Sequence, residues 1–151
     1  MTDFLPLQNN SQSYPINVAT FPEQKRPLVL IAESDADNRT ELKMLLDLYG
    51  INVLEAEDGE EAIDLIVRQC PDLALINARL PLLDGYEAAR LIRNIKSFDR
   101  MPIIFLSGET ERAFRKRAFA VGADSYHIAP LDIDRLDLIL GNFLFRAIDN
   151  A

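Results

Sequence analysis

The chain has 151 residues, of which 48% are hydrophobic and 26% are charged, and its formal net charge is −8. This size and composition predict one globular domain, and the negative charge argues against a general nucleic-acid binder or a protein held at anionic membranes. The sequence has no apolar run of membrane-spanning length, no secretory signal pattern and a single cysteine, Cys70, so we expect a cytoplasmic protein without a disulfide or a cysteine-held metal.

The first 27 residues form an N-terminal extension with its own composition. They hold four of the eight prolines, are rich in Asn, Gln and Ser, and show no helical or strand period. They also carry more apolar residues than a disordered tail usually does. We therefore expect part of this arm, Tyr14 to Phe21, to dock on its own domain or on a second copy, with the last helix as the preferred target.

From residue 28 onward, apolar runs of strand length alternate with amphipathic helices. Strands are expected near 28–32, 52–56, 72–76, 102–106 and 124–128, and helices near 37–49, 59–69, 85–95, 110–121 and 132–148. Asp35 or Asp37 can cap the first helix. This alternation predicts a doubly wound α/β domain over residues 28–148, with a five-stranded parallel sheet and helices on both faces. The functional site of such a domain lies at the carboxyl ends of its strands.

The most informative segment is residues 71–93, PDLALINARLPLLDGYEAARLIR. A buried strand ends at Asn77, a loop with Pro81 and the turn pair Asp84-Gly85 follows, and a helix starts near Tyr86. This segment resembles the phosphoacceptor segment of bacterial CheY-like response-regulator receiver domains. The resemblance implies that Asn77 stands where the family has the aspartate that accepts a phosphoryl group. A neutral carboxamide is a very poor nucleophile.

The other strand ends match further pocket positions of the family. Glu33 corresponds to the first acid of the pair that holds Mg²⁺ in receivers, and Ser34 stands where the second acid belongs. Ser107 corresponds to the switch Ser/Thr that binds the phosphoryl group. Ala129 replaces the lysine that pairs with phosphoryl oxygens, while Pro130 keeps the proline that follows it. The nucleophile, a metal ligand and the cation are therefore all replaced.

The resemblance covers residues 28–148 and implies a flavodoxin-like (βα)5 receiver fold without its chemistry, which is a pseudo-receiver. We expect no enzymatic activity, no output domain, and weak or absent Mg²⁺ binding, with Glu33 as the one residual cation ligand. The function so implied is a phosphorylation-independent protein-interaction and regulatory module in two-component signal transduction or a phosphorelay. Two alternatives remain: phosphorylation on another carboxylate such as Asp35, or binding of a small molecule in the vacated pocket.

Several pocket positions also have a purely structural interpretation. Asn77 suits a tight turn, and Ser107 at a strand end can bind backbone groups. Tyr126 matches the aromatic switch position of receivers, although an aromatic residue on a strand usually serves packing. These interpretations stay open at the level of the sequence.

Two surfaces are candidates for binding a protein partner, such as a histidine kinase or another signalling protein. The fourth helix gathers four cations on an acidic protein: Arg112, Arg115, Lys116 and Arg117. The last helix is expected to bury Leu136, Leu140, Phe143 and Ala147 at helical spacing. Leu138, Ile139 and Phe145 then lie off that stripe. Acids on this helix could pair with the basic fourth helix across a symmetric homodimer.

Overall fold

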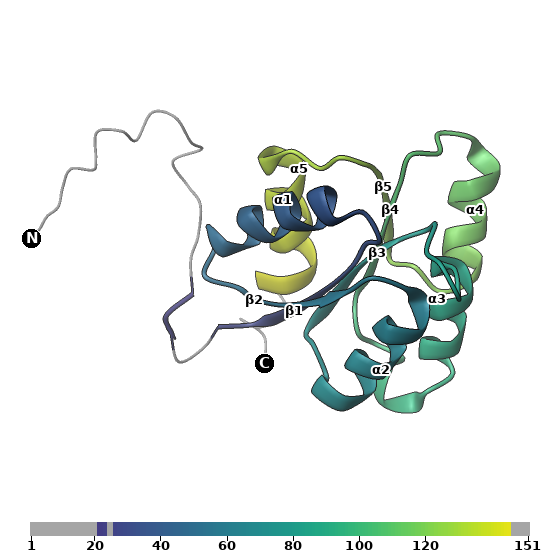
Figure 1. Ribbon diagram of the computed structural model, residues 1–151, viewed down its shortest axis with the longest axis horizontal. Coiled ribbons are helices and arrows are strands. Elements are labelled where there is room, and N and C mark those ends of the chain that lie inside the picture. The colour runs from purple at the N-terminus through teal and green to yellow at the C-terminus, as the bar shows by residue number, and fades with distance from the viewer. Residues whose placement is uncertain (1–20, 24–25, 146–151) are drawn as a thin grey trace, which may run out of the picture.

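The computed structural model describes residues 21–23 and 26–145, and these residues form the predicted doubly wound α/β domain (Figure 1). Five parallel strands form one sheet in the order β2-β1-β3-β4-β5. The strands are β1 Leu28–Ala32, β2 Asn52–Ala56, β3 Leu73–Asn77, β4 Ile103–Ser107 and β5 Ser125–Ile128. The helices are α1 Ala36–Asp47, α2 Gly59–Gln69, α3 Gly85–Arg93, α4 Arg112–Ala120 and α5 Ile133–Leu140.

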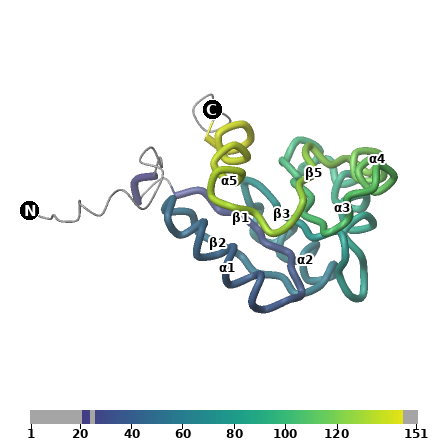
Figure 2. Tube along the Cα trace, turned by 90° about the horizontal axis from the view of Figure 1, so that it is seen from above, coloured from purple at the N-terminus to yellow at the C-terminus, as the bar shows by residue number. Residues whose placement is uncertain are grey.

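The helices divide into two layers, one on each face of the sheet. The α1 and α5 helices cover one face, where their apolar residues pack in one cluster with those of β1, β3 and β4. The α2, α3 and α4 helices cover the other face and build a second apolar cluster. Figure 2 shows α3 and α4 together at the end of the molecule away from α1. The central strands are buried on both sides, as expected for a parallel sheet between helices.

Four helices begin at an aspartate that caps the first turn. The carboxylates of Asp35, Asp58, Asp84 and Asp132 each accept a hydrogen bond from the backbone N–H three residues further on, at 2.7–2.9 Å. Such a cap satisfies one of the free N–H groups at the start of a helix, and its negative charge interacts favourably with the helix dipole. The α4 helix begins after Glu111 without a side-chain cap. Local sequence therefore sets where most of the helices start.

Some element ends differ from those predicted. The β3 and β4 strands run one residue further and end at Asn77 and Ser107. The α3 helix ends at Arg93 and is followed by a 3-10 turn, Lys96–Phe98, which the sequence did not indicate. The α5 helix ends at Leu140 and continues as a π-helical turn, Gly141–Phe145. The predicted end of the last helix, 146–148, lies outside the described residues.

The burial of side chains along the last helix differs from the prediction, and at Phe143 and Leu144 the π-helical turn accounts for the difference. The prediction that Ile139 lies off the core stripe is wrong, because this side chain is 1% exposed. Leu144 is also buried, whereas Phe143 is only partly buried and Leu138 is 62% exposed. A π-turn adds a residue per turn, so side chains beyond it no longer follow the α-helical period. Ala147 lies outside the described residues.

The end of the N-terminal arm contacts the layer of α1 and α5. The Phe21 ring lies 4.9 Å from the ring of Phe145, and the Phe21 N–H donates to the carbonyl of Tyr49 at 3.3 Å. Phe145 also packs against Tyr49, with 5.9 Å between ring centroids. The remainder of the predicted docking segment, Tyr14 to residue 20, lies outside the described residues. Phe145 is therefore packed within the chain and offers a partner less surface than predicted.

Candidate functional site

The carboxyl ends of β1, β3, β4 and β5 bring together four of the predicted pocket residues. In-register pairing of Ala32 with Ile76 places the next residues, Glu33 and Asn77, beside each other. The Ala129 N–H donates to the carbonyl of Ser107 at 2.9 Å, which joins the ends of β4 and β5. Glu33 is 7% exposed and Ser107 is 1% exposed. The parallel sheet thus assembles this site from segments far apart in the sequence.

Asn77 makes a hydrogen bond that a carboxylate at this position could not make. Its Nδ2 donates to Oε1 of Glu33 at 2.8 Å, and its Oδ1 accepts the backbone N–H of Arg79 at 2.9 Å. An aspartate here would place a second negative charge beside Glu33, and such a pair repels unless a cation or a proton lies between the two groups. The amide therefore replaces a repulsive contact with an attractive one.

The Glu33 carboxylate accepts a second hydrogen bond, from the backbone of Asp35. Oε2 of Glu33 accepts the backbone N–H of Asp35 at 2.9 Å, while the Asp35 side chain caps α1 through the N–H of Asn38 at 2.9 Å. Ser34, between them, is exposed and lines a different pocket. Of the side chains of Glu33, Ser34 and Asp35, only that of Glu33 forms a hydrogen bond with Asn77.

The loop after β4 is held by the side chains of Ser107 and Tyr126, the two positions at which the sequence resemblance implied a switch. Oγ of Ser107 accepts the backbone N–H of Glu109 at 3.0 Å, and the Tyr126 hydroxyl donates to the Glu109 carbonyl at 2.7 Å. The Tyr126 ring is 3% exposed, and the Arg115 guanidinium lies 5.1 Å from its centroid. Both polar groups of the Glu109 backbone are therefore bound by side chains from the neighbouring strands.

A second group of residues near the site was missed by the sequence analysis. Arg79 forms an ion pair with Glu109, in which Arg79 Nε lies 3.0 Å from Oε2 of Glu109, so the loops after β3 and β4 are linked. Each of these residues lies two positions beyond a strand end, Asn77 or Ser107. Because β3 and β4 are neighbouring parallel strands, with Asn77 paired to Leu106, this equal offset from the two strand ends was the signal that could have revealed the pair.

A pocket of about 390 Å³ lies beside this ion pair. Tyr86 lines it, and the Arg117 guanidinium stacks over the Tyr86 ring at 4.1 Å while approaching the Asp84 carboxylate at 3.9 Å. The Tyr86 hydroxyl is buried and has no hydrogen-bond partner among the described residues. Burial is the main cause that raises the pKa of this phenol above its ordinary value. Arg117 is thus engaged within the domain.

A pocket of about 330 Å³ lies on the other side of the site, between α1 and the segment that follows β5. Glu33, Asn77 and Ala129 all line it, so it coincides with the vacated position predicted from the sequence. The Ala129-Pro130 peptide bond at its rim is cis. Among the residues that the structure describes, no group of three or more His, Cys, Asp or Glu side chains is arranged to hold a metal ion.

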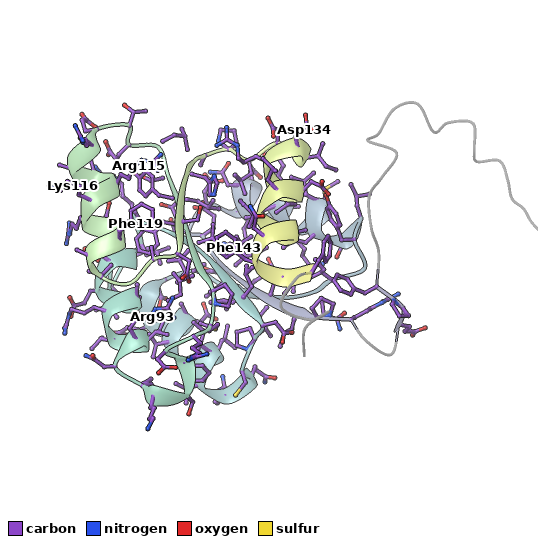
Figure 3. The ribbon with its side chains drawn as sticks, turned by 180° about the vertical axis from the view of Figure 1, so that it is seen from behind. Arg93, Arg115, Lys116, Phe119, Asp134 and Phe143 are labelled. Atoms are coloured by element: carbon purple, nitrogen blue, oxygen red, sulfur yellow. The ribbon has the colours of Figure 1, made fainter. Side chains whose placement is uncertain are left out.

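The basic α4 helix and the acidic α5 helix belong to the two layers on opposite faces of the sheet. Figure 3 shows Arg115 and Lys116 on α4 and Asp134 on α5, on opposite sides of the view. Phe119 on α4 is 44% exposed and adds an apolar element to the basic surface. Within residues 21–23 and 26–145, no helix is long and apolar enough to cross a membrane. The predicted pairing of α4 with α5 across a homodimer remains a prediction.

Comparison with known proteins identifies the family. The sequence profile described as "Response regulator receiver domain" matches residues 29–140. The response regulator MprA of Mycolicibacterium vanbaalenii is 32% identical over 108 residues, which are 72% of this chain and 46% of that protein. The chain spans about half the length of the curated relatives it matches.

Solved structures agree with the sequence match. The receiver domain of the sensor histidine kinase PA1611 of Pseudomonas aeruginosa, which coordinates a magnesium ion in its active-site cleft, is 31% identical with a TM-score of 0.74. The match covers 78% of this chain and 97% of that one. The receiver domain of the Francisella response regulator 1452 is 29% identical, with a TM-score of 0.73 and coverage of 81% and 99%. This chain belongs to the response regulator receiver domain family of two-component signalling.

Proposed function

We propose that this receiver domain acts as a phosphorylation-independent protein-interaction and regulatory module, a pseudo-receiver. The observation that carries the proposal is the hydrogen bond from Asn77 Nδ2 to Glu33. The group that donates this bond is an amide, whereas phosphoryl transfer needs a carboxylate nucleophile at this position. It also satisfies the neighbouring acid without a metal ion. Phosphoryl transfer depends on a nucleophile, metal charge and a counter-cation, and Asn77, Ser34 and Ala129 supply none of these.

The arrangement of the loop after β4 supports the same proposal. Ser107, Tyr126 and Arg79 all bind Glu109, so contacts within the protein hold the loop that leads to α4. No phosphoryl group is needed to order this loop. A signalling surface that includes α4 can therefore be presented permanently, rather than after modification.

The basic surface of α4 is the proposed docking site for a protein partner. Arg112, Arg115 and Lys116 are exposed on α4, and Phe119 is an exposed aromatic residue on the same helix. Arg and aromatic side chains are enriched at protein interfaces. Receiver domains bind phosphotransfer proteins, and the receiver domain of yeast Ssk1, 23% identical to this chain, was solved with the phosphotransfer protein Ypd1. We propose a histidine kinase or another acidic signalling protein as the partner here.

Incubation with acetyl phosphate and Mg²⁺ is expected to leave the protein unmodified, as measured by intact-mass spectrometry. The variant Asn77→Asp is expected to accept a phosphoryl group only slowly, because Ser34 and Ala129 still leave the metal and the counter-charge deficient. Losing one charge-assisted contact to a phosphoryl group costs about 1.5–3 kcal/mol, which is about tenfold or more in rate. The matched control is the triple variant Ser34→Asp, Asn77→Asp, Ala129→Lys, which is expected to label fastest.

Two results would contradict this proposal. Stoichiometric, base-labile labelling of the unaltered protein would favour the alternative acceptor, and its loss in Asp35→Asn would identify that residue. Labelling of Asn77→Asp as fast as the triple variant would show that the other two replacements do not matter.

Titration with Mg²⁺ followed by calorimetry is expected to show no saturable binding below the millimolar range. Glu33 is the one acid retained of the usual three, and its carboxylate already accepts two hydrogen bonds. Mg²⁺ gives up its water reluctantly and prefers carboxylate and phosphate oxygens. The double variant Ser34→Asp, Asn77→Asp restores two acids and is expected to bind Mg²⁺ measurably. Tight binding by the unaltered protein would mean that other carboxylates complete a site.

A further inference from the structure

The pocket between α1 and the segment after β5 has a lining that selects for one class of ligand. About half of its wall is apolar, and this half includes Leu42, Leu45, Leu106, Ala129 and Leu131. Leu42 and Leu106 are buried parts of the core, so these walls are firmly placed. Its volume of about 330 Å³ suits a small organic molecule.

The charged side chains that line this pocket are all negative. The described residues that line it include two acids, Glu33 and Glu41, and two amides, Asn38 and Asn77, but no Lys, Arg or His. Glu41 is exposed near the rim, whereas Glu33 is 7% exposed at the inner end. The pocket therefore combines apolar side chains with two carboxylates, a buried one from Glu33 and an exposed one from Glu41.

The inner carboxylate has hydrogen bonds but no cation. Oε1 and Oε2 of Glu33 each accept one N–H, from Asn77 and Asp35. The Arg39 guanidinium binds the backbone carbonyl of Glu33 and the carboxylate of Glu55 instead. Among the described residues, no basic side chain forms an ion pair with the Glu33 carboxylate. A carboxylate offers about four acceptor positions, so Glu33 can accept further hydrogen bonds.

The small side chain of Ala129 keeps this carboxylate reachable. Ala129 lies on the wall of the pocket next to Leu131, and a longer side chain at this position would fill the space in front of Glu33 and Asn77. A buried charge without a counter-charge is unfavourable, and a ligand that supplies the opposite charge gains from pairing with it.

We propose that this pocket binds a primary aliphatic amine, with the ammonium group at Glu33 and the alkyl chain against the leucine walls. An ammonium group has three donors and no acceptor, which complements a carboxylate with free acceptor positions. A hydrated Mg²⁺ ion would gain nothing from the apolar walls, and an anion would meet two like charges. This binding site goes beyond the proposed interaction role and does not depend on it.

The test is a titration of the full chain with pentylamine, followed by ¹H–¹⁵N correlation spectra. Pentanol and pentanoate are the matched probes, because they keep the chain but replace the charge. Pentylamine is expected to bind saturably and to shift the amide signals of Asn77 and Ala129, whereas the other two compounds are expected to show no saturable shift at the same concentrations.

Three variants locate the binding. Glu33→Gln keeps the shape of the side chain and is expected to weaken pentylamine binding about tenfold or more, as for the loss of a charge-assisted contact. Ala129→Leu fills the pocket and is expected to abolish binding, whereas Ala113→Leu, at an exposed position on α4, is expected to leave it unchanged. Glu41→Gln, an exposed substitution that does not disturb the core, is expected to weaken binding by a smaller factor. Thermal melts confirm that each variant is folded.

The proposal would be overturned by any of three results. These are the absence of saturable pentylamine binding, equal binding of pentanol, or unchanged affinity in both Ala129→Leu and Glu41→Gln. Phosphoryl transfer and protein binding are measured separately, so this outcome leaves the proposed function unaffected.

Discussion

Replacing Gly59 with alanine is expected to lower the free energy of unfolding by about 3 kcal/mol or more. Gly59 is the first residue of α2, and its backbone lies against the loop after β3. A Cβ atom added here would lie 1.8 Å from the carbonyl oxygen of Leu83 and 2.7 Å from its carbonyl carbon. Backbone atoms cannot rotate away as a flexible side chain can, so the loop or the helix start must move. Chemical denaturation measures the change.

The higher helix propensity of alanine would by itself raise the free energy of unfolding, so a decrease in the Gly59→Ala variant can be assigned to the close contact. In a helix, alanine is more favourable than glycine by about 0.5–1 kcal/mol, so a stabilised Gly59→Ala variant would mean that the close contact is absent. Gly108→Ala is the matched control. Nothing lies within 4 Å of a Cβ added there, and the change in unfolding free energy is expected to stay within about 0.5 kcal/mol.

The second large effect is expected for Arg93→Ala, which should lower the free energy of unfolding by about 3 kcal/mol. The Arg93 guanidinium donates to the carbonyls of Phe98, Met101 and Gly122 at 2.7–2.9 Å and pairs with Asp124 at 2.8 Å. Its side chain is 16% exposed. Figure 3 labels Arg93. Alanine would leave these acceptors without their donor, and such groups are costly when water reaches them poorly. A denaturant melt measures the loss.

Two further variants separate this network from charge alone. Arg93→Lys keeps the charge but not the planar set of five donors, so it is expected to recover only a minor part of the loss. Arg90→Ala removes an exposed arginine of the same helix that pairs with Glu87, and no measurable shift in the melting temperature is expected. If Arg93→Ala melted like Arg90→Ala, the carbonyl contacts would contribute nothing to stability.

The elements and the identity of the site were determined by local sequence. Strand-length apolar runs and aspartate caps act over a few residues, so they predict where strands and helices occur without knowledge of the fold. The rule that a parallel sheet carries its site at the carboxyl ends of the strands then placed Glu33, Asn77, Ser107 and Ala129 together. The proposed loss of phosphoryl chemistry at Asn77 also follows from local sequence, because it depends on the residue type at one position.

The long-range hydrogen bonds and ion pairs of the site were decided only by the tertiary structure. Asn77 donates to Glu33, 44 residues away, and Arg79 pairs with Glu109, 30 residues away. Such contacts depend on strand register and on side-chain rotamers, which no local pattern contains. Asp35 differs, because its carboxylate caps α1 through a contact three residues away, as one of the two caps expected from the sequence.

The surface of the last helix shows the same limit. Helical periodicity assumes a uniform helix, so it did not indicate Leu144, which lies in the π-helical turn Gly141–Phe145. Ile139 lies three residues after Leu136 within the regular α5 helix, so both side chains face the core and the expected stripe was too narrow. The covering of Phe145 by Phe21 and Tyr49 joins three segments of the chain. Sequence determined which residues are apolar enough to be buried, whereas three-dimensional packing decided which of them are covered, because burial depends on neighbours that are distant in the chain.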